Sequence, residues 1–158
     1  MSGSYIDIML QSLKKKEEVL KAIIDENLKQ REILEDVNGS AEDFDATVEA
    51  KASLIEQLEQ LDSGFQKLFD RIKEELEENQ EAYAGQIREI KQYIRSVTDK
   101  SIEIQTQEAR NKDLMTSKFA SVKKQVKTMR KSSAAASEYY KTMAKLNYVD
   151  PQFLDGKH

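Results

Sequence analysis

The chain has 158 residues and a formal net charge of -4, and this length argues against a two-domain enzyme. Charged residues make up 34% of the chain and aromatic residues only 7%, a composition that favours long solvated helices over a sheet architecture. Cysteine is absent, which excludes disulfides and cysteine-ligated metals and fits a reducing compartment. No apolar run approaches the roughly 20 residues of a membrane span and no signal-type stretch opens the chain, so we expect a cytoplasmic protein without membrane insertion.

The first predicted element is a helix over residues 4–37. Its mostly apolar residues follow one another at alternating steps of four and three positions, the spacing that places residues on one face of a helix. Ser4 is the expected N-cap, and Asn38-Gly39-Ser40 marks the reversal that follows, with a residue that tolerates a left-handed conformation. The face consists of Ile6, Leu10, Leu13, Glu17, Leu20, Ile24, Asn27, Arg31 and Leu34.

The same spacing predicts a second helix over residues 42–80. Gly64 lies inside it, where glycine costs about 1 kcal/mol relative to alanine, and this favours a kink or a close helix contact. The face consists of Phe44, Val48, Lys51, Ile55, Leu58, Asp62, Phe65, Phe69, Ile72, Leu76, Asn79 and Tyr83.

A third helix is predicted over residues 86–145. The spacing slips by one residue between Tyr83 and Ile87, beside Gly85, which indicates either a turn or a stutter in one continuous helix, and we favour the turn. At about 1.5 Å per residue this helix would reach about 90 Å and overhang the first two.

The predicted fold is all-α: an elongated antiparallel three-helix bundle, with a coiled-coil pattern and a long third helix. We expect one domain over residues 1–146. Residues 147–158 contain the only proline and lose the period, so we expect an extended or flexible tail there.

Groups suited to catalysis are missing from the sequence. The only histidine is His158, and no glycine-rich phosphate loop or nucleophile elbow is present. Paired acids such as Glu74-Glu75 lack the Glu-x-x-His motifs of helical metal sites, so we interpret them as a solvated face. We therefore expect no enzyme, no catalytic residue, no metal and no cofactor.

Charge is distributed unevenly along the chain. The segment from Glu42 to Lys91 holds fourteen acids and six bases, whereas Arg110 to Lys131 holds eight bases and one acid. The basic block is either a phosphate-binding surface or the complement of an acidic neighbouring helix or partner. We favour the second interpretation and expect no nucleic acid.

Polar residues interrupt the predicted helical faces at Glu17, Asn27, Arg31, Glu108 and Asn111. Such residues cost stability in a seam but fix its alignment, so layers such as Asn27 or Arg31 against Glu108 would specify one bundle. The alternative is that these layers weaken the core and let the bundle open for another polypeptide. We favour the control of register.

The distal part of the third face is a candidate binding groove for an amphipathic helix. An ordinary core is the alternative, but the overhang and the adaptable methionine side chains favour binding. The small residues 132–137 precede Tyr139 and Tyr140, which are candidate aromatic anchors. The candidate binding residues are Met115, Phe119, Val122, Val126, Met129, Ala136, Tyr140 and Met143.

The C-terminal run SEYYKTMAKLNYVDPQFLDGKH resembles the end of FlgN-like flagellar export chaperones, which often carry Tyr-Tyr-Lys-x-Met and a Phe-Leu-Asp-Lys-Lys-type tail. Gly156 and His158 depart from that tail. The segments VEAKASLIEQLEQLDSGF and IEIQTQEARNK extend the resemblance over most of the chain. The matching C-terminal residues are Tyr139, Tyr140, Lys141, Met143, Phe153, Leu154, Asp155 and Lys157.

The resemblance implies an all-helical chaperone that binds the C-terminal helical segments of hook-filament junction proteins and delivers them unassembled to the export gate. It also implies a gate contact by a C-terminal tyrosine, for which Tyr139 and Tyr140 are the candidates. We expect a monomer or a weak homo-oligomer. The alternative is a structural coiled coil that associates only with itself and has no client.

Overall fold

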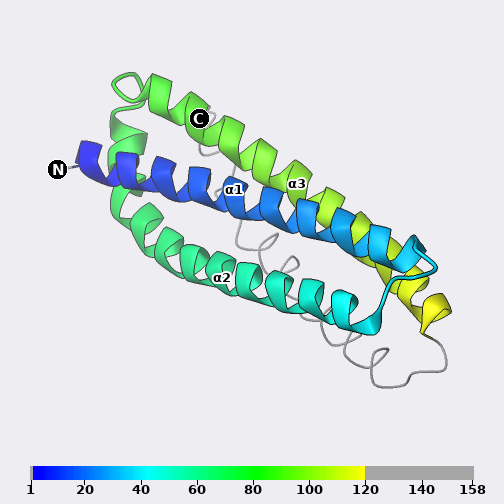
Figure 1. Ribbon diagram of the computed structural model, residues 1–158. Coiled ribbons are helices and arrows are strands. Elements are labelled where there is room, and N and C mark those ends of the chain that lie inside the picture. The colour runs from blue at the N-terminus through cyan, green and yellow to red at the C-terminus, as the bar shows by residue number, and fades with distance from the viewer. Residues whose placement is uncertain (1, 120–158) are drawn as a thin grey trace.

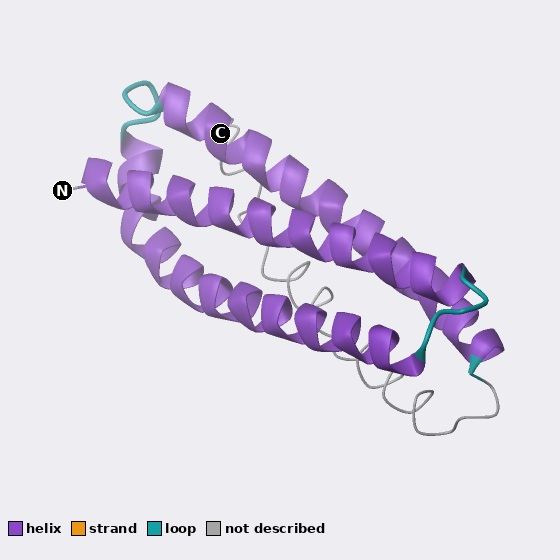
Figure 2. Cartoon of the chain, viewed as in Figure 1, coloured by secondary structure: helices purple, strands orange, loops and turns teal. Residues whose placement is uncertain are grey.

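The structure is a computed structural model that describes residues 2–119, which form three helices joined by short turns (Figures 1 and 2). α1 spans Ser2–Glu35, α2 spans Ala41–Glu78 and α3 spans Ala84–Lys118. No strand occurs within residues 2–119. The predicted all-α helical bundle is confirmed.

Helix α1 lies between the other two helices and packs along both of them (Figure 1). Gln30 of α1 lies opposite Thr47 of α2, whereas Asn27 of α1 lies opposite Gln107 of α3. Tyr5 at the start of α1 contacts Arg71 near the end of α2, so these two helices are antiparallel. Helices α2 and α3 approach each other closely at few points, which leaves α1 as the centre of the bundle.

Two buried rows run along α1, because this helix packs against both neighbours. Their seven-residue repeats are the a and d rows of a coiled-coil seam. Every residue of the first row belongs to the predicted face, and the row consists of Ile6, Leu13, Leu20, Asn27 and Leu34. The second row differs from the single face predicted for residues 4–37 and consists of Met9, Lys16, Ile23 and Gln30.

The apolar core is divided into three clusters along the bundle. The N-terminal cluster consists of Ile6, Met9, Leu13, Ile72, Leu76, Ile87 and Ile90. The middle cluster consists of Val19, Leu20, Ile23, Ile55, Leu58, Val97 and Ile104. The distal cluster consists of Leu34, Phe44, Met115 and Phe119. Polar contacts lie between successive clusters, so the core is segmented rather than continuous.

The turns explain where α2 begins and ends. Gly39 is required at the first turn because a Cβ atom there would lie 2.1 Å from the carbonyl oxygen of Ile33. Ser40 Oγ accepts a hydrogen bond from the backbone N–H of Asp43 at 3.1 Å, as an N-cap does. At the other end the chain turns over residues 79–83, which confirms a turn instead of a stutter.

The predicted N-cap was wrong, and so was one of the two alternatives for Gly64. Ser4 lies inside α1, which begins at Ser2, so Ser4 is not its N-cap. Gly64 lies in the uninterrupted helix α2, and a Cβ atom there would meet nothing within 4 Å. The glycine therefore does not serve a close helix contact.

Helix α3 ends at Lys118, well before the predicted end at residue 145. Phe119, the next residue, is not in the helical conformation. Its ring packs against Phe44, with centroids 5.7 Å apart. The predictions for residues 120–158, including the tail over 147–158, lie outside the described residues.

Candidate functional site

Phe119 marks the end of α3 beside the candidate groove, with φ -110° and ψ 28°. These angles lie outside the helical range, and its backbone N–H still donates to the carbonyl oxygen of Met115 at 2.9 Å. The apolar period does not reveal this end, because spacing reports which residues share a face and not where the chain leaves the helix.

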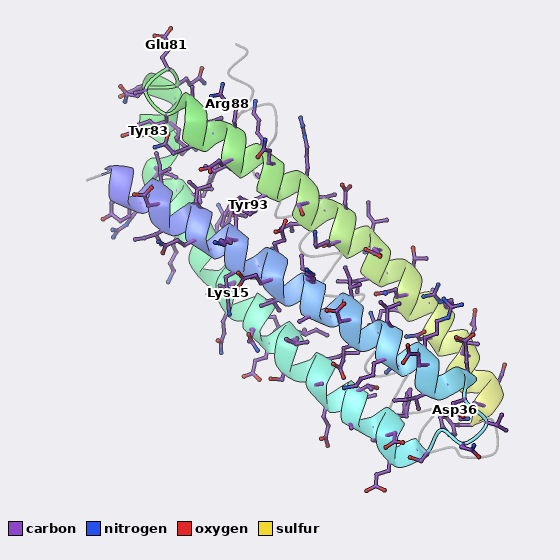
Figure 3. All side chains as sticks on the ribbon, turned by 45° about the horizontal axis from the view of Figure 1, so that its top comes forward. Lys15, Asp36, Glu81, Tyr83, Arg88 and Tyr93 are labelled. Carbon is purple, nitrogen blue, oxygen red and sulfur yellow. The ribbon has the colours of Figure 1, made fainter. Side chains whose placement is uncertain are left out.

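The described part of the candidate groove lies in the core. Met115 is fully buried and Phe119 is 8% exposed, and both pack in the distal cluster with Leu34 and Phe44. Lys118 donates to the carbonyl oxygen of Asp36, which holds the end of α3 against the turn after α1 (Figure 3). The other candidate residues lie outside the described residues: Val122, Val126, Met129, Ala136, Tyr139, Tyr140 and Met143.

A buried polar layer separates the distal cluster from the middle cluster. All three helices contribute to it, and every member is less than a tenth exposed. Its members are Asn27, Gln30, Thr47, Lys51, Gln107, Glu108 and Asn111. Asn27 and Glu108 thus share one layer, as expected for control of register. Arg31 was wrongly expected there, since it lies near the surface and pairs with Glu35 at 2.9 Å.

Side-chain amides join α1 to α3 within this layer. Asn27 Nδ2 donates to Gln107 Oε1 at 3.1 Å. Asn111 Nδ2 donates to the carbonyl oxygen of Asn27 at 2.9 Å and to Gln30 Oε1 at 3.1 Å. Gln30 Nε2 in turn donates to Thr47 Oγ1 on α2 at 2.9 Å. Because these bonds require particular residues to be level, they fix the alignment of the three helices.

Lys51 and Glu108 form an ion pair that joins α2 directly to α3. Lys51 Nζ lies 2.6 Å from Glu108 Oε1, and the two side chains are 0% and 5% exposed. Lys51 Nζ also donates to Gln30 Oε1 at 3.4 Å. A buried pair loses the hydration of both charges, so its attraction offsets a large desolvation cost and stabilises the fold weakly at best.

Three oxygens of this layer have neither a hydrogen-bond donor nor an ion-pair partner among the described residues: Asn27 Oδ1, Asn111 Oδ1 and Glu108 Oε2. Glu108 Oε1, by contrast, has its ion pair with Lys51. A buried acceptor without a donor costs about 1–3 kcal/mol, so three of them would cost about 3–9 kcal/mol. That sum is comparable with the roughly 5–15 kcal/mol by which a whole domain is stable. These acceptors therefore need donors if the layer is not to destabilise the core.

A second group of polar contacts lies between the N-terminal and middle clusters. Lys16 pairs with Asp62 of α2, and Ser96 of α3 donates to Glu17. Lys100 Nζ donates to Ser96 Oγ at 2.9 Å. Burial lowers the pKa of Lys16, and the nearby carboxylate of Asp62 opposes that shift. These groups have partners, in contrast to the acceptors of the buried polar layer.

The sequence did not single out Gln30, Thr47 and Gln107. The available signal was the seven-residue repeat, in which Gln30 follows Ile23 and Lys16. No cluster of metal-ligating side chains occurs within residues 2–119. None of the three described helices is long and apolar enough to cross a membrane.

A sequence model of the FlgN protein family matches residues 1–147, which cover all three helices. The chain belongs to the FlgN family. The resemblance predicted from the C-terminal residues is thereby confirmed, and this FlgN chain is a flagellar export chaperone. No curated protein and no solved structure matches the chain.

Proposed function

We propose that this FlgN chain binds the helical C-terminal segments of hook-filament junction proteins, prevents their premature assembly and delivers them to the export gate. The family match over residues 1–147 is the observation that carries the proposal. A helical segment that is unassembled exposes an apolar face, and covering that face prevents association with other copies.

The proposed client site is the apolar row that begins on α3. Met115 and Phe119 form its start, and they close the distal cluster beside the weakly satisfied polar layer. A client helix that reaches these two residues has to displace part of the distal cluster. Methionine side chains adapt to varied apolar partners. The proposed row consists of Met115, Phe119, Val122, Val126, Met129, Ala136, Tyr140 and Met143.

Charge supports the same site. The segment Arg110 to Lys131 contains eight bases and one acid, so it would attract a client helix with an acidic face and speed the encounter. Tyr139 or Tyr140 is the proposed contact with the export gate, since aromatic side chains often anchor interfaces.

The test is a calorimetric titration of the full chain with purified junction proteins. The double variant Val122→Asp/Val126→Asp is expected to bind at least about tenfold more weakly, which corresponds to about 1.4 kcal/mol. Ile102→Asp is the matched control, because Ile102 is an apolar residue of α3 that is 57% exposed outside the proposed row. Equal affinity of the double variant and the wild type would exclude the row as the client site.

Sedimentation at several concentrations tests the alternative of a self-associating coiled coil. A monomer that binds a junction protein one to one agrees with the chaperone proposal. A stable homo-oligomer that binds no junction protein would instead support the alternative.

A further inference from the structure

Three acceptor atoms of the buried polar layer have no donor within reach among the described residues. Its amide nitrogens already donate within the layer, while Asn27 Oδ1, Asn111 Oδ1 and Glu108 Oε2 receive no hydrogen bond among the described residues. Rotating an asparagine amide by half a turn would not remove this deficit. It would place an N–H group at the unpartnered position and remove the bonds that the nitrogen makes now.

The missing donor has to be neutral. Lys51 already balances the charge of Glu108, and the side chains of this pair are 0% and 5% exposed. A second buried cation would have no counter-charge, which is strongly unfavourable in a medium of low polarity. A molecule with two O–H donors serves two acceptors, so at least two such neutral molecules supply the three acceptors without adding charge.

Lys51 also needs an acceptor. Its ammonium group has three N–H donors, and Glu108 Oε1 and Gln30 Oε1 are its two acceptors among the described residues. A molecule that accepts from Lys51 and donates to Glu108 would complete both groups. Water is the small neutral molecule that does both, and buried waters typically make about three hydrogen bonds to otherwise unsatisfied groups.

We propose that the buried polar layer is a binding site for at least two internal waters, which together donate to Asn27 Oδ1, Asn111 Oδ1 and Glu108 Oε2 and accept from Lys51. Other buried hydroxyls do not call for such a site. Ser101, for example, is buried on α3 but donates to the carbonyl oxygen of Val97 at 2.7 Å. The proposal does not depend on the identity of the client.

Oxygen-17 magnetic relaxation dispersion of the full chain tests the proposal, because it detects water that stays in a protein longer than nanoseconds. The wild type is expected to show at least one such water. Asn27→Leu/Asn111→Leu, which removes two of the three acceptors, is expected to reduce the signal. Ser101→Ala is the matched control and should keep the signal of the wild type.

Either of two results would overturn the proposal: no long-lived water in the folded wild type, or an unchanged signal in a folded Asn27→Leu/Asn111→Leu variant. Far-UV circular dichroism shows whether each variant is folded. If the double variant does not fold, a high-resolution crystal structure of the wild type decides. Ordered water within hydrogen-bond distance of the three acceptors supports the site, and empty density there refutes it.

Discussion

Replacing Lys51 with methionine is expected to destabilise the chain strongly. The change leaves Glu108, whose side chain is 5% exposed, as a buried carboxylate without its cation at 2.6 Å. Removing one partner of a buried ion pair typically costs about 3–5 kcal/mol. At roughly 2–4 °C per kcal/mol for a chain of this size, Tm should fall by about 6–20 °C.

Urea unfolding followed by far-UV circular dichroism measures this change. The double variant Lys51→Met/Glu108→Leu should recover the loss and reach or exceed the wild type by about 1–4 kcal/mol, because neither charge remains buried. Arg31→Met is the matched control, since it breaks the exposed pair with Glu35 and should cost less than about 1 kcal/mol. If Lys51→Met lowers the free energy of unfolding no more than this control does, the layer is not closed to solvent.

Four further variants test the turns, helix α2 and the second group of polar contacts. Gly39→Ala should destabilise the fold by about 1–3 kcal/mol, because the added Cβ atom clashes with a backbone oxygen, whereas Gly64→Ala should stabilise it by about 1 kcal/mol. Equal changes of the free energy of unfolding in urea would contradict the different roles of the two glycines. Ser40→Ala should cost about 1 kcal/mol through the lost cap, and an unchanged Tm would argue against the cap. The pKa of Lys16 is lowered in the fold, so between that lowered pKa and 10.5 the unfolded chain holds more protons on Lys16 than the folded chain does. The stability of the wild type should therefore rise with pH over that interval, relative to the stability of Lys16→Met. A pH-independent difference between the two would contradict the lowered pKa.

The face of α3 up to Met115 was predictable because apolar residues recur along it at helical spacing, so that the few polar residues on the same positions stand out. Ile87, Ile90, Val97 and Ile104 follow one another at steps of three or seven residues, which keep one helical face, and all four are buried. The first two helices were located within a few residues for the same reason.

The second row of α1 was not predictable from hydrophobicity, because Lys16 and Gln30 make up half of it. Their burial depends on partners from other helices, Asp62 for Lys16 and Thr47 for Gln30, and the sequence alone does not show these pairs. The end of α3 at Lys118 was not predictable either, because the period of apolar residues continues past it.

The central position of α1 has a consequence for the order of folding. Contacts between α1 and α2 join residues as few as 17 positions apart, whereas Asn27 and Gln107 are 80 positions apart. Closing a longer loop costs more entropy, so we expect the hairpin of α1 and α2 to form first and α3 to dock last. During synthesis, the side of α1 that packs against α3 therefore stays exposed until α3 docks. A helix from another chain can compete with α3 for that side at this stage.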